Sequence, residues 1–266
     1  MIERAFVTDD GVRIAYSDYG PADGTPVVLC HGLAAAARQF VNDAEYFAGL
    51  GYRVLVPDLR GHGESGKLAG GRVADYAIPR LASDLIGMLD DAQAGAVHWV
   101  GNSLGGIIAL SLLGSHPERL RTVATFGTAF SLNLPRFGAV VIPLSYRVLG
   151  ARLTAWITAA GTSRSPAARR LVRQVLRKFD PEVGYAVAAN LVRYDLTANA
   201  VSTRVPMLML RGGRDKQVNR ALERALKAMR GLPHFRLVEV PAGGHCANLD
   251  ATDVVRRELL EFWSGR

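Results

Sequence analysis

Short apolar runs alternate with amphipathic stretches along most of the chain. Runs rich in valine and leucine predict buried strands over 26–30, 53–57, 96–100, 122–126, 206–210 and 235–240. Helical spacing of apolar residues predicts helices over 37–50, 75–91 and 219–229, and from 252 onwards. Near the start, apolar residues on both sides of Asp9-Asp10-Gly11 predict a hairpin. Strands separated by helices pair in parallel through crossovers, so we expect an α/β sheet with helices on both faces.

The alternation stops between residues 129 and 200. No run there predicts a strand, whereas 137–149 and 153–160 are apolar and suit helices. Ser165-Pro166 and Asp180-Pro181 each place a capping residue before proline, which is typical of a helix start. We therefore expect a core formed by residues 1–128 and 201–266, with a helical lid inserted at 129–200.

Charge separates the same segment from the rest of the chain. The net charge is +8. Between 129 and 200 there are 10 basic and 3 acidic residues, so this segment carries 10 − 3 = +7 and the remainder 8 − 7 = +1. The excess of positive charge is thus concentrated on the expected lid.

The sequence suggests a cytoplasmic protein without a metal or cofactor. It has no apolar run of about 18 residues, and its first residues lack the pattern of a signal peptide. Two cysteines, Cys30 and Cys246, make no disulfide framework and fit a reducing compartment. Histidine, cysteine and acidic residues do not occur with the spacing of metal ligands.

The most informative segment is Gly101-Asn102-Ser103-Leu104-Gly105. It follows a predicted strand and precedes an apolar run that suits a buried helix. A serine at such a sharp turn needs neighbours without Cβ atoms two residues away, and both are glycines. The pattern is that of a nucleophile elbow, which exposes the serine hydroxyl at the end of a strand. A tight turn with a capping serine is the alternative.

A serine hydroxyl needs a histidine base held by a carboxylate. Asp215 and His245 each follow a predicted strand, and the order serine, aspartate, histidine is that of the α/β-hydrolase fold. Asp58 is the rival carboxylate, although it precedes the nucleophile and is expected to brace its own loop. Among the remaining candidates, we expect loop-bracing roles for His31 and His62, and packing roles for His98, Cys30 and Cys246.

Several segments together resemble the α/β hydrolases, in particular the cofactor-free, lid-bearing group of esterases, lactonases and carbon–carbon bond hydrolases. They are His31-Gly32, Asp58-Leu59-Arg60-Gly61-His62-Gly63-Glu64-Ser65, Gly101–Gly106, Gly213-Arg214-Asp215 and Gly244-His245. The resemblance implies a mostly parallel, twisted sheet of about eight strands. It also implies that Ser103, Asp215 and His245 form the triad, and that the backbone N–H groups of Leu33 and Leu104 form the oxyanion hole.

The resulting hypothesis is a serine hydrolase that cleaves a small-molecule carboxylic ester or lactone with an apolar acyl part. A carbon–carbon bond hydrolase of aromatic ring-cleavage products is the first alternative, since Gly101-Asn102-Ser103-x-Gly105-Gly106 resembles that group. Members of that group usually have an aromatic residue after the catalytic histidine, where this chain has Cys246. A ligand-binding receptor on the same fold is the second alternative.

The expected lid has more apolar residues than a cover needs. One interpretation is an acyl pocket lined by Phe130, Phe137, Ile142 and Trp156. Another is peripheral contact with anionic lipid, because basic residues share the segment. A third is a lid packed on the sheet with a solvated arginine face. Nucleic acid is not expected as a partner, because the basic residues come without a recognised binding fold.

Overall fold

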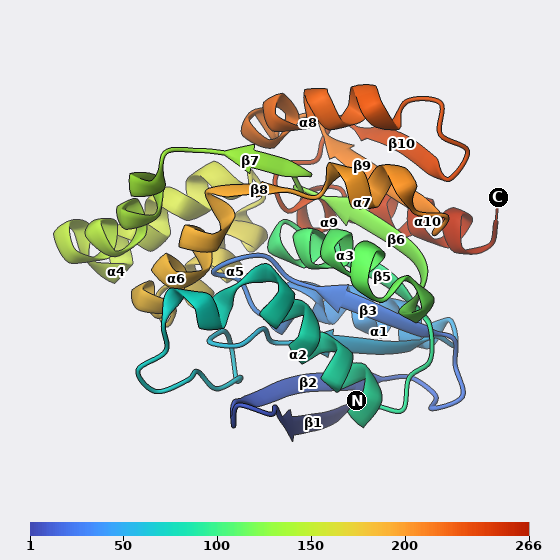
Figure 1. Cartoon of the computed structure of the whole chain (residues 1–266), viewed down its shortest axis with the longest axis horizontal. Helices are drawn as coiled ribbons and strands as arrows, with labels where there is room; N and C mark the ends of the chain where they lie inside the picture. Colours follow the sequence, from blue (N-terminus) through green and yellow to red (C-terminus); the bar gives the residue numbers. More distant parts are fainter. Residues whose placement is uncertain (266) are drawn as a thin grey trace.

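The computed structural model describes residues 1–265 and has the α/β-hydrolase fold, with a mostly parallel eight-stranded sheet (Figure 1). The spatial strand order is β1-β2-β4-β3-β5-β6-β9-β10. β2 runs antiparallel to β1 and β4, and the other pairs are parallel. The bounds are β1 Ile2–Val7, β2 Arg13–Tyr19, β3 Pro26–Cys30, β4 Arg53–Pro57, β5 Val97–Asn102, β6 Leu120–Phe126, β9 Met207–Gly212 and β10 Phe235–Val240.

Helices cover both faces of the sheet, as the sequence predicts. One face packs against α2 (Ile78–Asp91), α3 (Leu104–Ser115), α7 (Thr197–Ser202) and α8 (Lys216–Met229). The other packs against α1 (Val41–Gly49), α9 (Ala247–Asp250) and α10 (Thr252–Trp263). Short 3₁₀ turns lie at Ala37–Phe40, Val73–Tyr76 and Pro117–Arg119.

The two core layers explain why the predicted strands are apolar without alternation. Along β3, Val28 and Cys30 belong to one layer and Val27 and Leu29 to the other, and all four are buried. A strand covered on both faces has no polar side, so its sequence is a continuous apolar run. The sheet therefore holds the carboxyl ends of its strands in fixed positions.

The segment between β6 and α7 is the helical insertion expected as a lid, and it lies beyond one end of the sheet (Figure 1). The predicted boundary at residue 200 falls within α7, which packs with the core. Its helices are α4 (Val141–Thr162), α5 (Pro166–Leu176) and α6 (Pro181–Leu191), preceded by a 3₁₀ turn at Arg136–Val140. The expectation that this segment has no strand is wrong: β7 (Ser131–Asn133) pairs antiparallel with β8 (Arg193–Asp195). Each strand has only three residues, and most of them are polar, so neither produces an apolar run.

The lid helices begin where the sequence predicts. Ser165 Oγ accepts a hydrogen bond from Ala168 N at the start of α5, and Asp180 caps α6 through Glu182 N. Helix α4 is interrupted at Gly150, whose φ of 72° and ψ of 162° are not helical. This break separates the two apolar helices that the sequence indicates.

Candidate active site

Ser103 occupies the turn between β5 and α3 and has φ 51° and ψ −112°. A side chain other than glycine at positive φ is strained, and here the strain comes from the sharpness of the turn. A Cβ atom on Gly101 would lie 2.4 Å from Gly106 N, and one on Gly105 would lie 2.2 Å from the carbonyl oxygen of Cys30. Both glycines are therefore required by close backbone packing around the serine.

Asp215 and His245 meet at the carboxyl ends of β9 and β10. His245 Nδ1 lies 2.8 Å from Asp215 Oδ2. Asp215 also caps α8, where its Oδ1 accepts from Val218 N at 3.5 Å. The capping role and the predicted triad role thus use different oxygens of one carboxylate. Because the carboxylate accepts the Nδ1 proton, it fixes the tautomer that leaves Nε2 as a base.

Asn102 ties the serine turn to the histidine loop. Its Nδ2 donates to the backbone oxygen of His245 at 2.8 Å and to that of Phe126 at 3.2 Å. Its Oδ1 accepts from Gln39 Nε2 at 2.9 Å. Gly127, with φ 59°, makes this approach possible, because a Cβ there would lie 2.5 Å from the carbonyl oxygen of His245. This role of Asn102 is not among the sequence predictions, although a polar side chain beside the nucleophile on a buried strand is a signal for it.

The expected oxyanion hole lies beside the serine. A Cβ atom on Gly32 would come within 3.1 Å of Ser103 Cβ, so the loop after β3 passes directly next to the nucleophile. Leu104 is the first residue of α3, and its N–H has no acceptor within the helix. Leu33 follows Gly32 in the same loop and borders the cavity described below. The loop that carries Leu33 and the start of α3 at Leu104 thus both lie next to Ser103.

Two buried histidines brace the oxyanion loop, as the sequence predicts. His31 Nε2 accepts from Leu59 N at 3.1 Å, so its Nδ1 donates to Gly32 O at 2.8 Å. His62 Nε2 accepts from Ala34 N at 3.2 Å, and its Nδ1 donates to Arg60 O at 3.0 Å. Burial lowers the pKa of His31 to about 4 and that of His62 to about 3. Both rings are therefore neutral near pH 7, the state in which one nitrogen accepts and the other donates.

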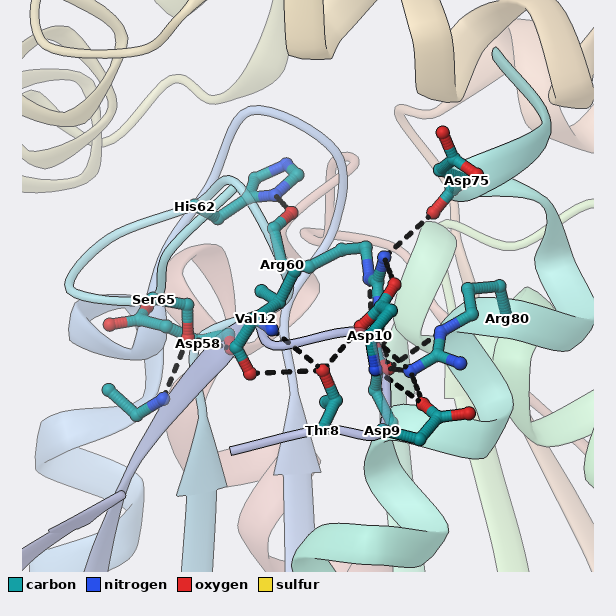
Figure 2. A network of polar contacts seen from close by, with 12 residues as sticks. Thr8, Asp9, Asp10, Val12, Asp58, Arg60, His62, Ser65, Asp75 and Arg80 are labelled. Carbon is teal, nitrogen blue, oxygen red and sulfur yellow. Dashed lines mark hydrogen bonds and ion pairs between the residues drawn. The ribbon is translucent and has the colours of Figure 1, made fainter. Parts of the chain in front are cut away.

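Figure 2 shows the polar contacts of the loop after β4, which carries Asp58, Arg60 and His62. The guanidinium of Arg60 is fully buried and pairs with Asp84 at 2.5 Å and Asp10 at 2.9 Å. The side chain of Asp58 accepts from Ala37 N at 2.7 Å and from Glu64 N at 2.9 Å. Asp58 therefore holds its own loop, in agreement with the sequence analysis.

Cys246 and His98 also take the structural roles expected of them. The Cys246 thiol is buried and lies 3.7 Å from Asn102 Oδ1, and burial raises its pKa to about 12. A thiol that stays protonated at neutral pH is a poor nucleophile. His98 Nδ1 lies 2.9 Å from Thr122 Oγ1 within the sheet, where burial lowers the pKa of the imidazole to about 4.

A cavity of about 190 Å³ lies between the catalytic loops and the lid. On the core side it is bordered by Leu33, Asn102 and His245. On the lid side it is lined by Thr158 and Thr162 of α4 and by Leu171, Val172, Val175 and Leu176 of α5. The cavity thus joins polar groups at the candidate catalytic site to an apolar wall. The helical stripe on α5 is visible in the sequence, where it reads as an ordinary packing face.

None of the four lid residues expected to form an acyl pocket lines this cavity, so that assignment needs correction. Phe130 is fully buried in the hydrophobic core. Phe137 and Trp156 are 74% and 57% exposed. Ile142 is half-buried and contacts the α6 backbone near Gly184. The apolar sequence of 129–144 suggested a pocket. In the structure, however, these side chains point into the core, towards α6 or outward, and not into the cavity.

Comparison with known proteins identifies the family. A family model described as "Serine aminopeptidase, S33" matches residues 22–251, and the chain belongs to this family of α/β hydrolases. The sequence is 31% identical over 137 residues to Epoxide hydrolase A of Mycobacterium tuberculosis, a match that spans 52% of this chain and 40% of that protein. It is 26% identical to a 2-hydroxy-6-oxononadienedioate/2-hydroxy-6-oxononatrienedioate hydrolase of Burkholderia vietnamiensis, over 96% of this chain and 93% of that one.

Among solved structures, the fold is similar to that of a thermophilic esterase from Thermogutta terrifontis. The TM-score is 0.86, with 22% identity over 100% of this chain and 99% of that chain. At this level of identity the likeness describes the fold. The chain thus belongs to a family of α/β hydrolases, and its relatives include proteins named as an epoxide hydrolase and as a 2-hydroxy-6-oxononadienedioate hydrolase.

Proposed function

We propose that this hydrolase cleaves a carboxylic ester or lactone with an apolar acyl part, through an acyl-enzyme on Ser103. The observation that carries the proposal is the convergence of a strained serine, an aspartate-held histidine and an apolar cavity at one end of the sheet. Ser103 Oγ attacks the carbonyl carbon while His245 Nε2 takes the hydroxyl proton. Asp215 stabilises the imidazolium that forms.

The remaining steps follow from the same geometry. The tetrahedral oxyanion accepts hydrogen bonds from the N–H groups of Leu33 and Leu104, and the positive end of α3 adds to this stabilisation. His245 returns its proton to the leaving alkoxide, which departs as the alcohol. Water, deprotonated by His245, then attacks the acyl-enzyme and releases the acid. With a lactone, alcohol and acid are two ends of one product.

A carbon–carbon bond hydrolase is the second candidate, and one observation favours it. Asn102 precedes the serine, and a relative that aligns over nearly the whole chain has the name of such an enzyme. Against it stands Cys246 after the histidine. In addition, the side chain of Asn102, although it borders the cavity, already bonds His245 O, Phe126 O and Gln39. The ester or lactone hydrolase therefore accounts better for these contacts. A receptor that only binds its ligand would leave the strained serine unexplained.

The test is a substrate panel of nitrophenyl esters of graded acyl length, an aliphatic lactone and a dienone ring-cleavage substrate. We expect turnover of the esters or the lactone to exceed that of the dienone, and Ser103→Ala to abolish it. Preferential turnover of the dienone would support the second candidate. Tight binding of the compounds without turnover would support the receptor.

A further inference from the structure

Helix α4 exposes large apolar side chains on both sides of its break at Gly150. After the break at Gly150, the exposed apolar side chains are those of Leu153, Trp156 and Ile157, which are 45%, 57% and 48% exposed. Before the break they are those of Val141, Leu144, Val148 and Leu149. Exposed large apolar side chains gathered on one element are typical of an interaction site. We call these seven residues the outer face of α4.

This face does not belong to the substrate cavity. Thr154, Ala155 and Ala159, on the opposite side of the helix, are buried, and Thr158 and Thr162 line the cavity. The helix is thus amphipathic in the reverse sense, with small and hydroxyl side chains turned inward and large apolar ones turned outward. In Figure 1, α4 lies at the edge of the molecule, away from the sheet.

Basic residues adjoin the outer face. Trp156 shares a shallow surface cavity of about 260 Å³ with Arg169, Arg170 and Arg173 of α5. Arg147 and Arg152, next to the break at Gly150, are exposed. Nothing acidic lies in the chain between residues 129 and 179. Tryptophan beside arginine is typical of surfaces that sit at the boundary between lipid headgroups and acyl chains.

We propose that the outer face of α4 docks on an anionic lipid surface, with its apolar side chains in the acyl boundary and the neighbouring arginines on the headgroups. Charge selects this occupant over a second copy of the chain, because two lids of net charge +7 repel each other while anionic lipid attracts both. The helix lies on the bilayer and does not cross it. Residues 137–162 are long and apolar enough to span, but the break at Gly150 and the packed inner face oppose insertion.

The test is sedimentation of the full-length Ser103→Ala variant with vesicles of phosphatidylcholine alone or mixed with phosphatidylglycerol. This readout is binding, so its result is independent of the proposed hydrolysis. We expect about ten-fold stronger binding to the anionic vesicles, and loss of that difference at about 0.5 M salt. Leu153→Gln should weaken binding about ten-fold, and Arg170→Gln about five-fold on anionic vesicles only.

Matched controls lie outside the lid. Leu50→Gln removes a leucine that is 53% exposed after α1, and Arg220→Gln removes an exposed arginine of α8; neither should change binding. If Leu153→Gln folds poorly, Val148→Gln provides the same test, because the Val148 side chain is 70% exposed. Equal binding of the lid variants and the Leu50→Gln control would overturn the proposal. So would a dimer that Leu153→Gln dissociates, combined with no sedimentation on vesicles.

Discussion

Asn102 Nδ2 donates a 2.8 Å hydrogen bond to the backbone carbonyl of His245, so the residue before the serine holds the loop that carries the proposed base. Strand β5 therefore fixes both the nucleophile and the histidine. Such positioning matters because a displacement of about 1 Å between reacting groups can cost about 10²-fold in rate.

Asn102→Ala should lower kcat about ten-fold or more and change KM little, because the base loses its support while the cavity remains. Asn248→Ala is the matched control. The side chain of Asn248 is a buried amide that bonds Gln39 O, Gln39 Nε2 and Asp43, and none of these bonds reaches His245. Both variants should lose about 1–3 kcal/mol in free energy of unfolding. Equal kcat values in the two variants would contradict the hypothesis that Asn102 positions His245.

Asp215→Asn should reduce kcat about 10⁴-fold, since an amide at this position favours the tautomer that blocks Nε2. Asp58→Asn should act mainly on stability, because that carboxylate accepts the N–H groups of Ala37 and Glu64. Steady-state kinetics and urea unfolding of both variants separate the two effects. A larger kinetic loss in Asp58→Asn would assign the triad acid to the loop after β4.

The pKa of His62 makes stability depend on pH. Its folded value of about 3 lies below the ordinary value of 6.5, so the unfolded chain takes up the proton first as the pH falls. The stabilisation is complete above about pH 6.5 and is lost as pH falls from there towards 3. Between pH 7 and 5 the wild type should lose about 2 kcal/mol more in free energy of unfolding than His62→Gln. Urea titrations at the two pH values measure this difference, and parallel losses would show that His62 does not titrate as argued.

The cavity predicts which lid substitutions change chain-length preference. kcat/KM for nitrophenyl esters should rise about four-fold per methylene and then level off where the cavity ends. Val175→Phe adds volume to the α5 wall and should move the plateau to shorter acyl chains. Trp156→Ala removes a side chain that faces away from the cavity and should leave the profile unchanged. If Trp156→Ala changed the chain-length profile and Val175→Phe did not, the acyl-binding site would lie on the outer side of α4 instead.

The sequence predicted those features whose signals are local. Strands that are buried on both faces have continuous apolar sequences, so β3 and β5 could be predicted. The turn at the serine requires two glycines, so the elbow could be predicted as well. Asp215 and His245 could be chosen because each follows a strand of a parallel sheet. The assignment of the acyl wall failed because helical rotation decides which side of a lid helix meets the cavity. Trp156 and Thr158 are two residues apart on α4, yet only Thr158 lines it.

The central claim is a covalent acyl-enzyme on Ser103. Its most direct measurement is mass spectrometry of peptides after acid quenching of the enzyme during turnover of a nitrophenyl ester. The account predicts the acyl group on the peptide that contains Ser103, and no adduct in Ser103→Ala. An acyl group found instead on Cys246 or another residue, or turnover that persists in Ser103→Ala, would contradict it.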